Sequence, residues 1–188
     1  MHRLTRQQAI ILVVLTMVWG INWPIMKAAV TGYPPLGFRA YSIVLGVPVL
    51  GLVLWLLKVP FRVPREHWRE LFWLTVFNML FWHALIIVAV KSLSSGRAAI
   101  LGYTMPIFSA VIGALVYQAR LSLRAWAGVG AAAAGVLLLL WHEFGQLGGR
   151  PVAVAMALVA AATWALGTQM LRRTRIPGPS LTLSLIHI

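Results

Sequence analysis

Aromatic and polar side chains recur at helical spacing inside the apolar stretches of this sequence. Trp19 and Trp23 lie four residues apart, as do Asn78 and Trp82, so each pair shares one face of a helix. In hydrocarbon an unsatisfied polar group costs several kcal/mol, so such residues face a bundle interior or a cavity. An aromatic and amide lining would bind a small organic molecule. We therefore expect a substrate-binding pocket lined by Trp19, Asn22, Trp23, Asn78, Trp82, His83, Tyr103, Thr104 and Trp164.

Two residues near this pocket allow alternative roles. His83, one step around the helix from Trp82, would either titrate near neutral pH and carry a proton, or stay neutral and hydrogen-bond to a neighbouring helix. Pro24 frees the backbone carbonyl of Gly20. That change either exposes polar backbone to a ligand or only shapes helix packing. Both choices stay open at this point.

Enzymatic chemistry lacks the residues it needs in this sequence. The three acids, Glu66, Glu70 and Glu143, lie at or near the ends of apolar stretches, the five histidines are scattered, and there are no cysteines. A catalytic site needs convergent acids, metal ligands or an activated nucleophile. We therefore expect no enzyme activity, no metal and no cofactor. Glu66 and Glu70 are expected to be solvated partners of Arg65 and Arg69.

The composition is that of a membrane protein. Of the 188 residues, 61% are hydrophobic and 10% charged, and the mean hydropathy is +0.87. Soluble domains are about 45–50% apolar and about 25% charged, so this chain has too little polar surface to cover a core in water. The net charge of +13 comes from basic residues placed between apolar spans, which favours topology signals over nucleic-acid binding. The expected partners are the lipid bilayer and a small-molecule substrate.

Six apolar stretches are long enough to cross the bilayer, since its hydrocarbon core requires about 20 residues of helix. They are Gln8–Val30, Leu36–Leu57, Glu70–Val90, Ser94–Tyr117, Ala125–Trp141 and Val152–Leu171. The first is too long for a typical signal peptide and is followed by five more. With the N-terminus inside, 11 Lys and Arg residues fall on inner segments and 5 on outer ones, so both ends are expected in the cytoplasm. The predicted fold class is an all-α polytopic membrane protein.

Prolines, small residues and cations mark further features of these spans. Pro106 predicts a kink near Gly102. Cations near the outer span ends, such as Lys27 and Arg39, would either extend to lipid headgroups or attract an anionic or zwitterionic substrate. Rows of small residues indicate either packing surfaces between helices or a dimer seam. The rows are Ser109 with Gly113; Ala127, Ala131 and Gly135; and Ala153, Ala157, Ala161 and Ala165.

The sixth span repeats part of the first. Trp164-Ala165-Leu166 has the same order of Trp, small residue and aliphatic residue as Trp19-Gly20-Ile21, at an offset of 145. The match indicates that the sixth span opens a second copy of a five-span unit. Because five is odd, the second copy would be inverted across the membrane, a common construction of secondary transporters.

These residues resemble the EamA-like family of the drug/metabolite transporter superfamily. The resemblance is carried by Trp19–Lys27, Phe38-Arg39, Trp164–Gly167 and the stretch Leu93–Leu140, which contains a Ser-Ser-Gly-Arg run, a Pro-Ile-Phe run and an Arg-Leu-Ser run. It implies a ten-helix fold of two inverted five-helix repeats. Residues 8–141 would then be the first repeat, 152–175 the first helix of a truncated second repeat, and 176–188 a loop and tail. One departure is Gln118-Ala119, where the family usually has Gly-Glu.

The resemblance implies a multi-pass inner-membrane transporter of small metabolites or amphipathic compounds, working as an exporter by alternating access. A non-transporting scaffold or assembly subunit is the alternative, and a homodimer is a further expected partner. With half of the cavity missing, the 188-residue chain is expected not to transport. Leu183–Ile188 reads like the translation of a transposase end sequence, so we expect it to be non-native; a genuine short tail is the alternative.

Overall fold

The computed structural model describes residues 5–59, 63–141 and 150–177, and the regular structure in these ranges is helical. Thr5 and Gln8 form a capping box, in which Gln8 N–H donates to Thr5 Oγ1 at 3.2 Å and Thr5 N–H donates to Gln8 Oε1 at 2.9 Å. The first helix, α1 (Arg6–Gly32), therefore begins one residue after Thr5 and runs unbroken through Pro24. Pro35 opens α2 (Pro35–Leu56) at a position where its missing N–H costs nothing.

The third span changes helix type in its middle. A single 3-10 turn, η1 (Arg65–His67), leads into α3 (Trp68–Leu74). The π-helix η2 (Thr75–Leu80) follows, and α4 (Phe81–Ser92) completes the span. A π turn is wider than an α turn, so it rotates the residues after it relative to those before it.

The fourth span is broken in two. Ser94 caps α5 (Ser95–Gly102) by accepting a hydrogen bond from Arg97 N–H at 3.3 Å. The helix stops at Gly102 and resumes as α6 (Met105–Leu115), with Pro106 in its first turn. The kink that Pro106 predicts near Gly102 is thus confirmed.

Two more helices complete the described fold, α7 (Leu123–Trp141) and α9 (Pro151–Leu171). Judged by length and composition, five stretches of the described chain can cross a membrane, namely Arg6–Gly32, Pro35–Leu56, Arg65–Ser92, Ser95–Leu115 and Pro151–Leu171. The apolar part of α7, Leu123–Leu138, is shorter. All six predicted spans are therefore helical, and the chain is an all-α polytopic membrane protein.

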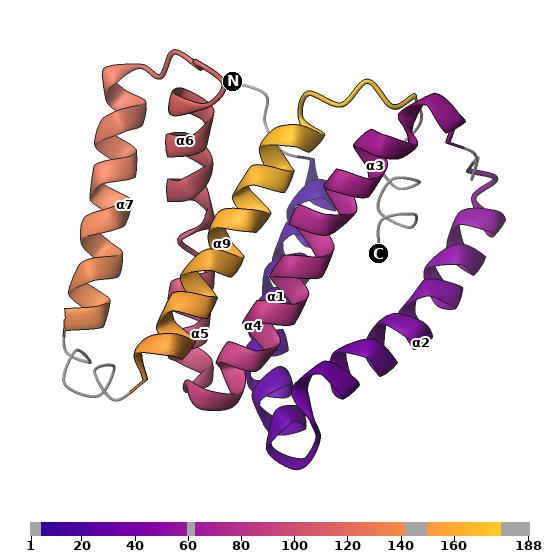
Figure 1. The fold of residues 1–188 in the computed structure, drawn as a ribbon, viewed down its shortest axis with the longest axis horizontal. Helices are drawn as coiled ribbons and strands as arrows, with labels where there is room; N and C mark the ends of the chain where they lie inside the picture. The colour runs from indigo at the N-terminus through magenta and orange to yellow at the C-terminus, as the bar shows by residue number, and fades with distance from the viewer. Residues whose placement is uncertain (1–4, 60–62, 142–149, 178–188) are drawn as a thin grey trace.

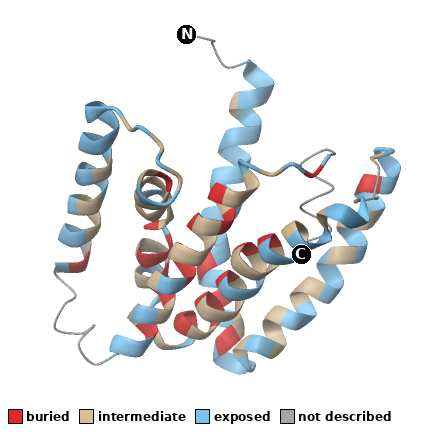
Figure 2. Ribbon diagram, turned by 45° about the horizontal axis from the view of Figure 1, so that its top comes forward, coloured by how far each residue is buried: buried red, intermediate tan, exposed pale blue. Residues whose placement is uncertain are grey.

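Helix α9 lies in the middle of the bundle, although it comes last in the sequence. It packs against α4 on one side and α6 on the other, and α4 also contacts α1 and α2 (Figure 1). Helix α2 leans away from the rest at its far end (Figure 1). The buried residues cluster where α1, α4, α5 and α9 meet (Figure 2).

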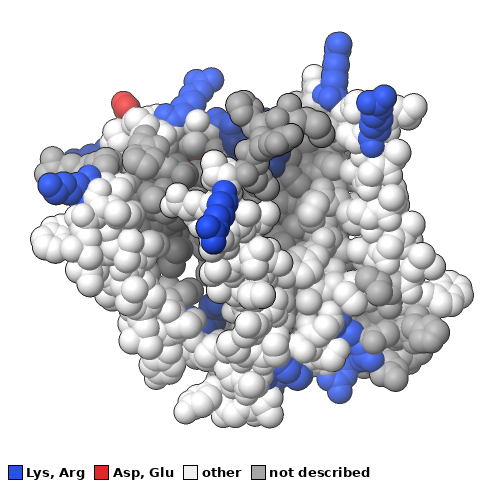
Figure 3. Space-filling model, turned by 180° about the vertical axis from the view of Figure 1, so that it is seen from behind, with Lys and Arg blue, Asp and Glu red and all other residues white. Residues whose placement is uncertain are grey.

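The basic residues gather at the two ends of the bundle (Figure 3). The start of α1, the start of α3, the α6–α7 connection and the end of α9 lie at one end (Figure 1). Arg6, Arg65, Arg69 and Arg120 belong to these segments. The basic residues predicted to lie on one side of the membrane therefore lie at one end of the bundle. That this end is the cytoplasmic one stays a prediction.

Two distant cations cap the end of α4. Lys27 Nζ donates to the carbonyl oxygens of Val90 at 3.1 Å and Lys91 at 2.9 Å, and Arg150 Nη1 donates to Ser92 O. The last carbonyls of a helix lack partners within the helix and carry partial negative charge. Lys27 thus binds protein backbone, an outcome that differs from both roles expected for it, lipid headgroup contact and substrate attraction.

Replacing Lys27 with Met should lower the free energy of unfolding by about 1.5–3 kcal/mol, the usual worth of hydrogen bonds to a charged group. Unfolding in a mixed detergent series, followed by circular dichroism, would measure it. Lys91→Met is the matched control, because Lys91 is an exposed lysine on the last turn of α4, the helix that Lys27 caps. Equal stability of the two variants would contradict the capping role.

The rows of small residues behave differently from one another. In α9, Ala157, Ala161 and Ala165 are fully buried, so this row is a packing surface between helices as predicted. In α7, Ala127 and Ala131 are exposed, and a side chain at Gly135 would meet nothing within 4 Å. The α7 row is therefore not a packing surface within the described part of the chain.

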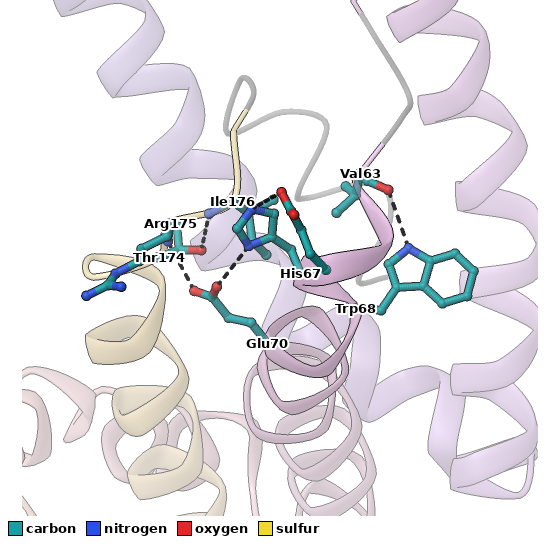
Figure 4. Close-up of polar contacts among 8 residues, drawn as sticks. Val63, His67, Trp68, Glu70, Thr174, Arg175 and Ile176 are labelled. Carbon is teal, nitrogen blue, oxygen red and sulfur yellow. Dashed lines mark hydrogen bonds and ion pairs between the residues drawn. The ribbon is translucent and has the colours of Figure 1, made fainter.

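The segment after α9 folds back onto α3 (Figure 4). Glu70 Oε1 accepts a hydrogen bond from Arg175 N–H at 3.3 Å, and Ile176 is buried with Leu74. His67 lies 3.5 Å from a Glu66 oxygen and 3.7 Å from a Glu70 oxygen. The expected pairing of these acids with Arg65 and Arg69 was wrong, because the 3-10 turn places His67 between them. The expected non-native tail, Leu183–Ile188, lies outside the described residues.

Candidate ligand site

Four aromatic rings from four spans meet in the middle of the bundle. Trp23 Nε1 donates to Tyr103 Oη at 3.1 Å, and their rings meet edge to face with centroids 5.8 Å apart. The Trp82 and Trp164 ring centroids lie 5.3 Å apart. Trp23 and Trp82 are buried, whereas Tyr103 is 45% exposed. The Trp23 and Trp82 indoles thus form the buried base of the site, and the Tyr103 ring lies at the accessible edge of the site.

Gly102 brings the two halves of this aromatic cluster together. A Cβ at Gly102 would lie 2.7 Å from Trp23 Cη2 and 3.4 Å from Trp82 Cη2. No side chain fits at the first of these distances, so the end of α5 must be glycine for both indoles to reach it. The break after Gly102 then turns Tyr103 out of the helix and toward the accessible edge.

Asn78 lies on the π-helix, where η2 contacts α9. A Cβ at Gly167 would lie 2.8 Å from Asn78 Cβ and 3.0 Å from Asn78 Cα, so η2 and α9 approach at backbone distance. Asn78 is buried, and its Oδ1 has no hydrogen-bond partner among the described residues. Asn78 is therefore a polar side chain buried inside the bundle, as its place in an apolar stretch predicts.

A groove between α6 and α9 connects the aromatic cluster with one end of the bundle. Its inner part, with a volume of about 310 Å³, is lined by Tyr103, Trp164 and Thr168 among others. Its outer part, about 560 Å³, is lined by Gln169 and the basic residues that follow α9. Pro106, Ser109 and Arg172 line both parts, so the two cavities adjoin.

Gln169 holds the outer part of this groove in shape. Its Nε2 donates to Ser109 O and Ser109 Oγ, both at 2.8 Å, and its Oε1 accepts from Arg173 Nη1 at 2.5 Å. The Arg173 guanidinium also lies 4.1 Å from the centroid of the Tyr117 ring, a cation–π contact. Gly113 leaves room for the amide, because a Cβ there would lie 3.2 Å from Gln169 Nε2.

The structure brings together only some of the residues that the sequence predicts for the pocket. Trp23, Trp82, Tyr103 and Trp164 form the cluster described above. Thr104 is buried, but its hydroxyl donates to Leu101 O at 2.6 Å within its own turn. The Thr104 hydroxyl therefore satisfies a backbone carbonyl beside the break between α5 and α6.

Trp19 and Asn22 are not part of this aromatic cluster in the described chain, and their role in substrate binding stays a prediction. Trp19 is 40% exposed, and Asn22 is exposed, with its amide donating to Met26 Sδ at 3.8 Å. Helical spacing places Trp19 on the same face of α1 as Trp23, but only Trp23 is buried.

His83 follows Trp82 in α4 and faces a different neighbour, since consecutive residues of an α-helix are about 100° apart. It lines a cavity between α2 and α4 together with Thr75, whereas Asn78 faces α9. Asn78 and Trp82 both lie against α9, at Gly167 and Trp164 respectively, so the face expected for this pair is shared. His83 Nδ1 is buried and lacks a hydrogen-bond partner among the described residues, so the expected bond to a neighbouring helix is not made by this nitrogen.

Gln169 is the main site residue that the sequence analysis missed. A signal for it was present, because it is a side-chain amide inside a predicted span with an arginine four residues later. Those two positions lie on one face of a helix. The close approach of other spans to Gly102 and Gly167 had no such signal in the sequence, because it depends on how separate spans pack.

The fold and the site define a multi-pass helical membrane protein with interrupted spans around an internal aromatic cluster. Residues 7–141 match the EamA-like transporter family, and the chain belongs to that family. The resemblance seen in the sequence is thereby confirmed. The family is one of transporters.

Curated relatives are similar over most of this chain. The chain is 25% identical to "Uncharacterized transporter YoaV" of Bacillus subtilis over 81% of its own length and 52% of the relative. It is 27% identical to a "Probable amino-acid metabolite efflux pump" of Salmonella typhimurium, over 87% and 53%. It is 23% identical to "Uncharacterized inner membrane transporter YedA" of Escherichia coli K12, over 87% and 52%. The chain thus spans about half the length of these relatives, and no solved structure matches it significantly.

Proposed function

We propose that this chain is the substrate-binding half of an inner-membrane exporter of small metabolites or amphipathic compounds. The observation that carries the proposal is the groove between α6 and α9, which joins an aromatic cluster inside the bundle to a basic end. A carrier needs such a site within the membrane and a route from it to one surface. The outward direction and the membrane are supported by the relatives named as an efflux pump and an inner-membrane transporter.

The two interrupted spans support alternating access. Helix breaks in transporters lie next to the substrate site and give its walls room to move. Here the break between α5 and α6 follows Gly102 and the π-helix contains Asn78, and both contact the aromatic cluster or α9. We propose that residues 8–141 form one repeat and that α9 begins a second, inverted one, with the basic end of the groove in the cytoplasm.

Transport is proposed to need more chain than these 188 residues. The relatives are about twice as long, and the groove is open along its side in this chain. Proteoliposomes containing the 188-residue chain should therefore show no uptake of a ¹⁴C-labelled amino-acid mixture above empty liposomes. A lengthened chain, extended past Ser180 along the genomic reading frame to the length of these relatives, should show uptake. Flux through the 188-residue chain alone would contradict this requirement.

Tyr103 is the residue best suited to test the site. Replacing it with Ala in the lengthened chain should reduce export of the labelled amino acids about tenfold, the effect of losing about 1.4 kcal/mol of binding to a ring and its hydroxyl. Export is compared at equal expression, because the substitution also leaves the indole N–H of the buried Trp23 without its acceptor. Tyr41→Ala is the matched control, since Tyr41 is an exposed tyrosine on α2.

The same pair of variants separates a carrier from a scaffold. A non-transporting assembly subunit would be indifferent to the loss of Tyr103 and would show no flux in the lengthened chain. The row Ala127, Ala131 and Gly135 on α7, of which the two alanines are exposed, is the feature that a scaffold or a homodimer would use. Flux that is equal in Tyr103→Ala and unaltered protein would overturn the proposed site.

A further inference from the structure

A second cavity lies between α2 and the third span, away from the aromatic cluster. It has a volume of about 260 Å³ and is lined mainly by apolar side chains of α2, η2 and α4. The polar groups in its wall are Arg39, Thr75 and His83. Figure 3, which shows the molecule from behind, shows the surface hollowed beside the column that contains α2. Nothing in the proposed transport route uses this cavity, so the inference below does not depend on that proposal.

Arg39 has no anionic partner in the described chain. Its Nη2 donates to the thioether of Met26 at 3.0 Å, and its Nε is buried without a hydrogen-bond partner among the described residues. A thioether is a weak acceptor, and the guanidinium keeps its charge under all ordinary conditions. The ion pairs of the described chain, those of His67 with Glu66 and Glu70, lie at the opposite end of the bundle.

His83 adds a second unsatisfied nitrogen to the same cavity. Its Nδ1 is buried and lacks a partner within residues 5–59, 63–141 and 150–177. Thr75 offers no anion, and its hydroxyl donates to Leu71 O at 2.9 Å. Arg39 lies one turn into α2, near the predicted outer span end, yet its Nε is buried, and a buried charged group without a partner is costly. Two buried nitrogen atoms without hydrogen-bond partners in the described chain, Arg39 Nε and His83 Nδ1, therefore belong to residues that line one apolar cavity.

We propose that this cavity binds the anionic headgroup of a small amphipathic molecule, with a carboxylate against Arg39 and His83 and the apolar body along α2 and η2. A carboxylate matches a guanidinium in geometry, and it can accept from Arg39 Nε–H and from His83 Nδ1 in the tautomer that carries the proton on Nδ1. The cavity volume suits a short molecule. Helix α2 otherwise contacts the bundle mainly through α4, so the ligand would join α2 to the third span.

The absence of cysteine from the sequence makes the cavity accessible to site-specific labelling. Ala84 lines it, and Ala84→Cys would be labelled with N-ethylmaleimide in nanodiscs of phosphatidylcholine that contain the 188-residue chain. Octanoate should slow the labelling, and octanamide, which has the same apolar body without the charge, should slow it about tenfold less. Ala127→Cys on the exposed side of α7 controls for effects of either compound on the bilayer.

Arg39 variants test the origin of the selectivity. In the Ala84→Cys background, Arg39→Gln should abolish the difference between octanoate and octanamide, and Arg39→Lys should retain part of it. Circular dichroism and gel filtration report whether each variant is folded. If Arg39→Gln does not fold, the comparison of the two compounds on the Ala84→Cys chain alone still decides, because equal protection by octanoate and octanamide overturns the proposal.

A phospholipid could supply the same anionic chemistry, so one arm of the experiment changes the lipid. Nanodiscs containing phosphatidylglycerol should leave the labelling rate of Ala84→Cys unchanged if the natural ligand is a free carboxylate. Slowing by phosphatidylglycerol alone, lost in Arg39→Gln, would support the anion site and assign its ligand to the bilayer. Protection that persists in folded Arg39→Gln would overturn the site for both sources.

Discussion

Replacing Gly167 with Ala should lower the free energy of unfolding by about 3 kcal/mol, at the upper end of the usual cost of overpacking. The new Cβ would lie 2.8 Å from Asn78 Cβ and 3.0 Å from the Asn78 backbone nitrogen. A side chain can change rotamer, but backbone atoms in a packed helix cannot. Helix α9 would have to move away from η2, and its contacts with α4 would open as well.

The matched control is Gly128→Ala on α7, where a Cβ meets nothing within 4 Å. Alanine is the better helix former by about 1 kcal/mol, so this variant should be as stable as the unaltered chain or more so. Thermal unfolding in detergent, followed by circular dichroism, would compare the two. Equal melting temperatures for both variants would show that η2 and α9 do not approach as closely as described.

Removing the Trp82 side chain should produce an effect of similar size. Trp82 is 6% exposed and contacts Trp164, with ring centroids 5.3 Å apart. Large-to-small changes of this kind cost about 3–5 kcal/mol in soluble cores. The lower end applies here, because lipid solvates an unpacked apolar side chain almost as well as the protein does. We therefore expect a loss of about 3 kcal/mol for Trp82→Ala.

Trp55→Ala provides the comparison, since Trp55 is 66% exposed on α2. Its loss should change stability by less than about 0.5 kcal/mol, the usual effect of a surface substitution. Detergent unfolding gives the free energies, and Trp82→Phe should recover part of the loss. If Trp82→Ala matched Trp55→Ala in stability, the aromatic cluster would have to be a loose surface feature instead of a packed centre.

The sequence was sufficient for the spans and for part of the site. Apolar runs of membrane length predicted the six helical spans that the structure describes, because the bilayer imposes length and internal hydrogen bonding on each span separately. The break near Gly102 followed from Pro106 for the same reason, since proline acts on its own turn. These features depend on local chemistry.

The rest of the site could not be predicted because it depends on contacts between spans. Trp19 and Trp23 look equivalent on a helical wheel, and only the position of α5 shows that Trp23 is the buried one. Lys27 looked like a residue for headgroups, and only the end of α4 beside it shows its partner. His83 was placed in the pocket beside Trp82, and only the packing of α2 against α4 shows that it lines a separate cavity. The wider turn between Thr75 and Leu80 was also not visible in the spacing.

That wider turn has a consequence for how the protein can change over evolution. A π-helix of this kind is equivalent to one extra amino acid inserted into an α-helix, which shifts every later residue by about 100°. Deleting a single position between Val76 and Met79 would restore the regular helix and send Trp82 to a different neighbour. One codon gained or lost there therefore reassigns half a span, and with it the side chains that a transported molecule would meet.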